Sequence, residues 1–256
     1  AHFYTEVRYK GTKTVAISSD FGEMAKFSDI WMAPRQGTDA ALAMAMGHVI
    51  LKEFHIDNPS DYFEDYTRRL TDMPMLVCLN KDEQGYRPGY CLRASQLDQQ
   101  LGEEKNAEWK TIVWDENADS LAVPNGSVGF RWDGSAKWNL ETKAQGQEIL
   151  AARSLKERAD DVVRVGFGYY GGEHDEMIYR KVPVKKITLA NGETQLVATV
   201  FDLLIAQYGV DNGLGDENVA KDYFEDKPYT PAWQEKHTGV KPELVIRVAR
   251  EFAQNA

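Results

Sequence analysis

Thr14-Val15-Ala16-Ile17-Ser18 is a short apolar run rich in β-branched residues, and Ile30-Trp31-Met32-Ala33 is a second short apolar run. Runs of this kind predict buried strands. Between them, Glu23–Asp29 predicts a short helix with Met24 and Phe27 facing inward. Two strands joined by a helix indicate a parallel pair, because a crossover of this type returns the chain in the same direction.

A long helix is predicted from Ala40 to about Phe54, with Thr38 or Asp39 as its N-cap. Its apolar residues fall on one face at helical spacing: Leu42, Ala45, Met46, Val49 and Ile50. The resulting strand, helix, strand, helix order is typical of a parallel sheet. The expected fold class is therefore α/β, with a partial Rossmann-like parallel sheet and flanking helices.

The middle of the chain, residues 80–198, predicts an irregular, strand-rich insert because turn signals are dense there. The clearest hairpin joins Lys186–Leu189 to Thr194–Val200 across Ala190-Asn191-Gly192-Glu193. Ala144–Ala159 is polar and is expected to be either a mobile surface segment or a helix.

The last part of the chain predicts helices again. Thr199–Tyr208 has helical spacing, Thr230-Pro231 is a helix start with a hydroxyl cap, and Lys241-Pro242 opens the last helix. We therefore expect three parts: an α/β portion over 1–79, a strand-rich insert over 80–198 and a helical portion over 199–256.

Composition limits the class of protein. The 256 residues are 43% hydrophobic and 27% charged, which excludes a disordered or low-complexity chain. The net charge of −10 argues against nucleic acid as a partner, because phosphate binding needs a positive surface. No apolar run approaches the length of a membrane span and no secretory signal is visible, so direct membrane insertion is not expected.

Polar residues follow both predicted strands. Ser18-Ser19-Asp20 comes after the first strand, and Gln36-Gly37-Thr38-Asp39 comes after the second strand and leads into the long helix. Ligands of open parallel sheets bind outside the carboxyl ends of the strands, so these two segments are expected to lie together at a ligand edge. Gly37 would let a ligand approach the backbone closely.

Two carboxylates in these segments favour a guanine nucleoside. Asp20 at a strand end can accept hydrogen bonds from ribose hydroxyls, and Asp39 can accept two parallel bonds from the N1–H and the exocyclic amine of guanine. Adenine offers no such pair of donors on one edge. The structural alternative is that Asp39 only caps its helix and Asp20 only forms a turn.

Other motifs assign no further chemistry. The sequence has no GxGxxG after a strand and no GxxxxGK(S/T), so it lacks the fingerprints of NAD and ATP sites. His48 and His55 do not have the four-residue spacing of paired metal ligands on a helix. Cys78 and Cys91 are expected to be reduced thiols, too few for a four-cysteine iron–sulfur cluster. We predict no catalytic residue and no metal ligand in this stretch.

Several longer runs resemble the molybdopterin oxidoreductases, and most closely the catalytic alpha subunits of membrane-bound respiratory nitrate reductases. Gly37-Thr38-Asp39 is shared by the whole superfamily. Several runs resemble the nitrate reductase branch: Met46–Val49, Phe54–Pro59, Tyr66–Arg69 with Thr71–Leu76, Pro124–Trp132, Tyr229–Trp233, Thr238–Val240 and Ala249–Ala253. The resemblance extends over essentially the whole chain.

The resemblance implies a role for the two loops. Ser18–Gly22 and Gly37–Asp39 match stretches that hold one guanosine end of molybdopterin guanine dinucleotide. The expected cofactor-binding residues are Ser18, Ser19, Asp20, Gly22, Gln36, Gly37, Thr38 and Asp39. The family carries two of these dinucleotides on one molybdenum, together with a 4Fe-4S cluster. The ligands of the cluster and of the metal are expected outside this segment.

Members of this branch reduce nitrate to nitrite by oxygen-atom transfer at molybdenum, in anaerobic respiration. Their electrons come from an iron–sulfur beta subunit and a haem-bearing membrane gamma subunit, which implies a place on the cytoplasmic face of the inner membrane. The chain starts at Ala1 without Met. We therefore expect an internal portion of an alpha subunit, inactive when isolated.

Two other classes of function stay open at this point. One is a non-catalytic α/β scaffold or interaction module. The other is an unrelated nucleotide-dependent enzyme with a Rossmann-like half, for which binding of an adenine nucleotide would be the deciding signal.

Overall fold

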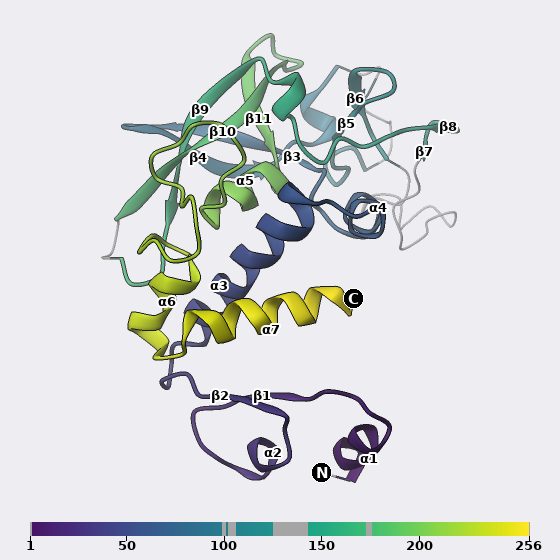
Figure 1. Cartoon of the computed structure of the whole chain (residues 1–256). Coiled ribbons are helices and arrows are strands. Elements are labelled where there is room, and N and C mark those ends of the chain that lie inside the picture. The colour runs from purple at the N-terminus through teal and green to yellow at the C-terminus, as the bar shows by residue number, and fades with distance from the viewer. Residues whose placement is uncertain (1, 99–100, 102–105, 125–142, 173–175, 256) are drawn as a thin grey trace.

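The computed structural model describes residues 2–98, 101, 106–124, 143–172 and 176–255. Its elements form three groups along the molecule (Figure 1). A small parallel sheet with two short helices lies at one end, a group of helices lies in the middle, and a five-stranded sheet lies at the other end. The mixture of helices and strands confirms the predicted α/β class.

The small sheet consists of β1 (Val15–Ile17) and β2 (Ile30–Met32), which pair in parallel as predicted. Helix α1 (His2–Tyr9) precedes β1, and helix α2 (Glu23–Lys26) joins the two strands. The predicted burial of Met24 and Phe27 is wrong, because both side chains are exposed. Helix α2 is a single turn, and a helix this short cannot present a continuous apolar face to the sheet.

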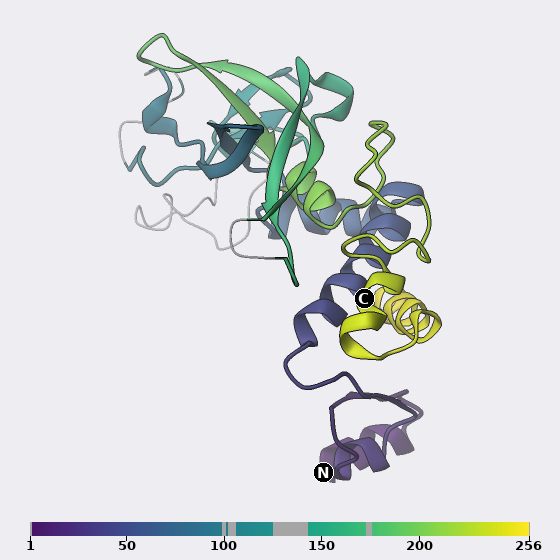
Figure 2. The same cartoon turned by 90° about the vertical axis from the view of Figure 1, so that its left-hand side faces the viewer.

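The predicted long helix is α3 (Asp39–Leu51), which continues as a π-helical segment over Lys52–Asp57. Its buried residues Leu42 and Ala45 pack against the side chains of Val240, Val245 and Val248. These partners lie on or next to the last helix, α7 (Pro242–Gln254). Figure 2 shows α7 beside α3 in the middle of the molecule.

Helix α6 (Pro231–Thr238) also packs on α3 and follows the predicted start and stop signals. The Thr230 hydroxyl accepts a hydrogen bond from the N–H of Trp233 at 3.1 Å, and Pro231 is the first helical residue. Gly239 ends the helix in the left-handed conformation, with φ of 78°. Such a φ is strained for residues with a Cβ atom, which explains the glycine.

The larger sheet closes on itself in the order β10-β11-β3-β4-β9. Its pairs are antiparallel except for a short parallel contact between β4 and β9. The predicted hairpin is confirmed, with Lys186 opposite Leu196. The strands are β3 (Leu76–Asp82), β4 (Gly85–Cys91), β9 (Asp161–Gly168), β10 (Met177–Thr188) and β11 (Thr194–Thr199). Strand β3 runs across residue 79 and pairs with β4 and β11. The predicted division of the chain into parts at residues 79 and 198 stays a prediction.

Shorter elements surround this sheet. Of the two alternatives predicted for Ala144–Ala159, the helix is wrong, because this stretch contains part of a small hairpin and a 3-10 turn. Most of the Pro124–Trp132 run lies outside the described residues. The shorter elements around the larger sheet are α4 (Asp61–Leu70), η2 (Ala94–Gln96), β5 (Val113–Asp115), β6 (Ser120–Ala122), β7 (Lys143–Ala144), β8 (Gln147–Glu148), η4 (Lys156–Arg158) and α5 (Val200–Gln207). Among the helices that the structure describes, none is long and apolar enough to cross a bilayer.

Candidate functional site

The carboxyl ends of β1 and β2 bring the two predicted loops to the same edge of the small sheet. Ile17 lies opposite Met32, and the N–H of Ser18 donates to the carbonyl of Met32 at 3.0 Å. The indole Nε1–H of Trp31 donates to the carbonyl of Ser18 at 2.9 Å. The chain leaves both strands at this edge (Figure 1), as the sequence predicted.

The first loop, Ser18–Gly22, is held mainly by its own polar groups. The Ser18 hydroxyl donates to Oδ1 of Asp20 at 3.0 Å. Ser19, Asp20 and Gly22 are exposed. Gly22 is the N-cap residue of α2 with φ of −80°, and a Cβ atom there would meet only Asp20 Oδ2 at 3.6 Å. The local backbone therefore does not require glycine at this position.

The second loop contains a tight turn over Arg35–Thr38. The N–H and the hydroxyl of Thr38 both donate to the carbonyl of Arg35, at 3.2 and 2.6 Å. Gly37 has φ of +77°, the value that the third residue of a type II turn needs, and Gln36 is exposed beside it. A Cβ atom on Gly37 would meet open space. The positive φ, rather than a close neighbouring group, therefore explains the glycine.

Asp39 is the first residue of α3, and the N-cap position belongs to Thr38. No side-chain hydrogen bond caps this helix. The Asp39 side chain is exposed, and within the described part of the chain neither Asp39 nor Asp20 is ion-paired with a cation. The amino end of α3 carries partial positive charge, which favours a carboxylate there. Asp39 thus presents a charged acceptor to solvent.

These observations fit the nucleotide end of the expected cofactor. Two exposed carboxylates and a bare glycine turn lie past the ends of neighbouring parallel strands. No hydrogen bond joins Ser19, Asp20 or Gly22 to Gln36–Asp39 among the residues that the structure describes. Whether the two carboxylates converge on one nucleoside, and the binding roles of the eight residues, stay predictions.

The supports of the second loop were not predicted from the sequence. The Tyr170 hydroxyl donates to the carbonyl of Gly37 at 3.1 Å, and Arg35 donates to the carbonyls of Lys236 and His237. These partners lie 133 to 202 residues away along the chain. The Tyr229–Trp233 and Thr238–Val240 runs, which helped to suggest the family, lie in or next to α6 but did not indicate these hydrogen bonds.

A second polar cluster is buried near α5 and α4. Arg153 donates to His55 Nδ1 at 3.1 Å and to Glu64 at 3.2 Å, and its guanidinium lies 4.6 Å from the Phe201 ring centre. Burial lowers the pKa of His55 to about 4, and the positive charge of Arg153 adds to this shift. Asp202 next to it is wholly buried, and burial raises its pKa to about 6. Asp202 accepts hydrogen bonds from Ser154, Leu155 and Thr199. Since Arg153 and Asp202 both have hydrogen-bond partners within the protein, the cluster indicates a structural role.

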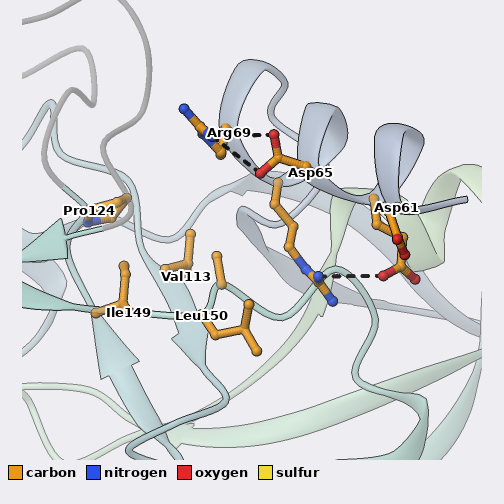
Figure 3. Close-up of a pocket in the computed structure, with 10 residues that line it drawn as sticks. Asp61, Asp65, Arg69, Val113, Pro124, Ile149 and Leu150 are labelled. Atoms are coloured by element: carbon orange, nitrogen blue, oxygen red, sulfur yellow. Dashed lines mark hydrogen bonds and ion pairs between the residues drawn. The ribbon is translucent and has the colours of Figure 1, made fainter.

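A cavity of about 200 Å³ lies between α4 and the β5–β6 and β7–β8 hairpins. Figure 3 shows Asp65 and Arg69 on its α4 wall, facing Val113, Ile149 and Leu150. Both of its guanidiniums are already paired with carboxylates, since Arg69 pairs with Asp65 at 3.3 Å and Arg68 pairs with Glu64 at 3.6 Å. No group of three His, Cys, Asp or Glu side chains among the described residues could hold a metal ion.

Comparison with known proteins relates the chain to one protein family. A sequence profile described as "Molybdopterin oxidoreductase" matches residues 1–222. The respiratory nitrate reductase 2 alpha chain of Escherichia coli is 54% identical over 266 aligned residues, which cover 100% of this chain and 21% of that protein. The respiratory nitrate reductase 1 alpha chain of the same organism is 52% identical, with the same coverage. The nitrate reductase alpha chain of Bacillus subtilis is 45% identical, again over 100% of this chain and 21% of its own.

The chain therefore spans about a fifth of the length of the curated relatives it matches. The profile match covers most of the sequence and includes both loops at the edge of the small sheet. The chain belongs to the molybdopterin oxidoreductase family.

Proposed function

We propose that this chain is an internal portion of the catalytic alpha subunit of a respiratory nitrate reductase, in which its Ser18–Gly22 and Gln36–Asp39 loops hold the guanosine end of a molybdopterin guanine dinucleotide. Two observations support the proposal. The first is the identity of 45–54% to nitrate reductase alpha chains over the whole chain. The second is the pair of exposed carboxylates past the ends of β1 and β2.

The two carboxylates would divide the recognition of guanosine. Asp39 accepts from the N1–H and the exocyclic amine of guanine, which selects this base over adenine. Asp20, oriented by its hydrogen bond from the Ser18 hydroxyl, accepts from the ribose hydroxyls. The glycine turn at Gly37 leaves room for the nucleoside beside the backbone.

In the full-length protein the cofactor is molybdenum bis(molybdopterin guanine dinucleotide). When bound, it supplies the oxygen-atom transfer that converts nitrate to nitrite, with two electrons and two protons removing the oxygen as water. The 4Fe-4S cluster has its ligands outside this segment, and the isolated chain is inactive. Electrons reach the alpha subunit from an iron–sulfur beta subunit and a haem-bearing membrane gamma subunit, on the cytoplasmic face of the inner membrane.

Asp39→Ala in the full-length protein tests this assignment. Hydrogen bonds to a charged group contribute roughly 1.5–3 kcal/mol, so we expect cofactor retention to fall by roughly tenfold or more. The measurement is molybdenum and released guanine nucleotide per polypeptide. Asp61→Ala is the matched control, because Asp61 is also an exposed first residue of a helix.

Normal molybdenum and guanine content in Asp39→Ala would contradict the proposal. Binding of an adenine nucleotide in place of guanine would instead favour an unrelated nucleotide-dependent enzyme. Absence of both metal and nucleotide from the wild-type protein would favour a non-catalytic scaffold.

A further inference from the structure

The side chains of the Arg35–Asp39 loop are almost all exposed to solvent. Arg35, Gln36, Gly37 and Asp39 are exposed, and Thr38 is half-buried. Side chains of the loop therefore cannot fix its conformation by packing in the core, as the apolar face of α3 does. A loop that selects a base by two parallel hydrogen bonds needs a fixed position, so its rigidity must come from contacts with other elements.

Arg35 ties the start of the loop to the end of α6. Its backbone N–H donates to the carbonyl of Thr238 at 2.9 Å, and its Nη1–H donates to the carbonyls of Lys236 at 2.8 Å and His237 at 3.3 Å. The last carbonyls of a helix have no partner within the helix and carry partial negative charge. A guanidinium at this position is therefore held by both hydrogen bonds and charge.

Helix α6 is a firm support for such contacts. Trp233, Gln234 and Thr238 are buried. Gln234 donates to the carbonyl of Val240 at 2.7 Å, which fixes the turn after the helix. The helix also packs on α3, the same helix that begins with Asp39. The Arg35–Asp39 loop is thus attached at its start to α6 and at its end to α3, two helices that pack on each other.

Tyr170 holds the middle of the loop from the connection between β9 and β10. Its hydroxyl donates to the carbonyl of Gly37 at 3.1 Å. Its ring makes edge contacts with His237 at 5.3 Å and Trp233 at 6.1 Å between ring centres, and its backbone N–H donates to the Tyr229 hydroxyl at 2.9 Å. The contacts of its ring and of its backbone therefore fix the position of Tyr170, whose hydroxyl binds the Gly37 carbonyl.

We propose that Arg35 and Tyr170 are positioning residues for guanosine binding, which clamp the Arg35–Asp39 loop onto α6 so that the Asp39 carboxylate is presented to the base. The proposal rests on the proposed function and extends it to the strand-rich insert and the helical C-terminal part. The hydrogen bond to the Gly37 carbonyl fixes the peptide group two residues before Asp39. Because binding and clamping are linked, cofactor binding is expected to order α6 in return.

The experiment uses the full-length, cofactor-loaded protein. Tyr170→Phe removes only the hydroxyl, and Arg35→Met removes the donors while keeping much of the side chain. We expect both to release guanine dinucleotide faster than wild type, by roughly three- to tenfold for Tyr170→Phe and more for Arg35→Met. The measurement is the rate of nucleotide release after dilution. Tyr62→Phe and Arg69→Met are matched controls on the exposed face of α4.

Two further measurements separate positioning from general stability. In the double variant Asp39→Ala with Tyr170→Phe, release is expected to be no faster than in Asp39→Ala alone, because Tyr170 acts through the same loop. Arg35→Lys keeps one charged donor and should restore part of the retention. Amide hydrogen exchange over residues 36–41 should rise in Tyr170→Phe, while exchange in α7 stays unchanged.

The outcomes distinguish the two proposals. Wild-type release rates in both Tyr170→Phe and Arg35→Met, together with fast release in Asp39→Ala, would overturn the clamp and leave the proposed function intact. Wild-type release in Asp39→Ala as well would overturn the proposed function. Additive effects of Tyr170→Phe and Asp39→Ala, or faster exchange throughout the protein in Tyr170→Phe, would show a general structural role and would also overturn the clamp.

Discussion

At the scale of single residues, His48 on α3 is a buried histidine with one polar contact. Its Nδ1 lies 2.8 Å from the carbonyl of Tyr208, and it is 1% exposed. Burial lowers the pKa of His48 to about 4, although the hydrogen bond opposes part of the shift. The ring is therefore neutral at pH 7 and donates its Nδ1–H to the carbonyl.

This lowered pKa predicts a loss of stability in acid. The folded state resists protonation of His48 between its ordinary pKa of 6.5 and about 4, so stability falls as pH drops through this window. The shift corresponds to roughly 3 kcal/mol of unfolding free energy. Urea unfolding of the chain at several pH values measures it. His48→Gln should lose stability less steeply over this window, and an unchanged slope in that variant would contradict the prediction.

The local conformation of the Gln36–Asp39 loop could be predicted from its residue types. Gly37 and Asp39 belong to one continuous stretch, and their turn and helix start follow from local signals. Tyr170 and Arg35 escaped prediction as supports because a hydrogen bond to a backbone carbonyl leaves no pattern in the partner's sequence. Whether such a hydrogen bond forms depends on how the whole chain folds, which the local sequence does not show.

At the scale of elements, Arg180 joins β10 to the end of α5. Its side chain is fully buried and donates to the carbonyls of Asn218, Ala206, Gln207 and Pro228. Burial lowers the pKa of Arg180 to about 10, so it remains charged at neutral pH. The guanidinium thus gives a donor to the carbonyl of Gln207 at the end of α5 and a second donor to the carbonyl of Ala206, which also accepts from the N–H of Gly209 at 3.0 Å.

Removing this group should destabilise the fold strongly. Arg180→Met removes the donors that the guanidinium gives to the part-buried carbonyls of Gln207, Asn218 and Pro228. Each unsatisfied group costs about 1–3 kcal/mol, so we expect a loss of roughly 3 kcal/mol or more. The exposed pair of Arg69 with Asp65 is the control, because Arg69→Met should change stability by less than about 1 kcal/mol. Denaturant unfolding compares the two. Equal effects of both variants would refute the assigned role of Arg180.

Element boundaries followed local chemistry wherever a cap was present. The starts of α5 and α6 match Thr199 and Thr230, whose hydroxyls accept from backbone N–H groups. The π-helical continuation of α3 over Lys52–Asp57 was not predicted, since its apolar spacing resembles that of an ordinary helix. The β7–β8 hairpin over Lys143–Glu148 was missed because its residues are mostly polar and its strands are two residues long.

At the scale of the whole molecule, apolar side chains gather on the small sheet and its helices without cover from the described residues. Phe3 is 78% exposed, Phe21 62% and Met24 49%. Trp31 is also partly exposed and contacts Phe21, with ring centres 5.0 Å apart. A two-stranded parallel sheet with an open apolar face is unusual in a protein on its own, because parallel sheets are normally covered on both faces.

We therefore predict that the isolated chain self-associates through this surface. Light scattering over a concentration series should show an average mass that rises above that of the monomer. Phe21→Ser should reduce the association, whereas Phe252→Ser, on the exposed face of α7, should not. A strictly monomeric chain at high concentration would count against the prediction.

The arrangement of the whole molecule was only partly predictable. The parallel pair β1–β2 follows from neighbouring segments, so its pattern lies within one stretch of sequence. The closed sheet depends on pairing β3 with β11 and on the contact of β4 with β9, which join distant parts of the chain. Each strand there shows an apolar pattern, but the pattern does not name its partner.

The most direct test of the central claim is a structure of the full-length protein with its cofactor bound. The account predicts one guanosine at the edge of β1 and β2. The Asp39 carboxylate should lie within about 3 Å of guanine N1 and its exocyclic amine, and Asp20 should lie within the same distance of a ribose hydroxyl. A guanosine bound away from this edge, or Asp39 paired with a cation from another part of the protein, would contradict it.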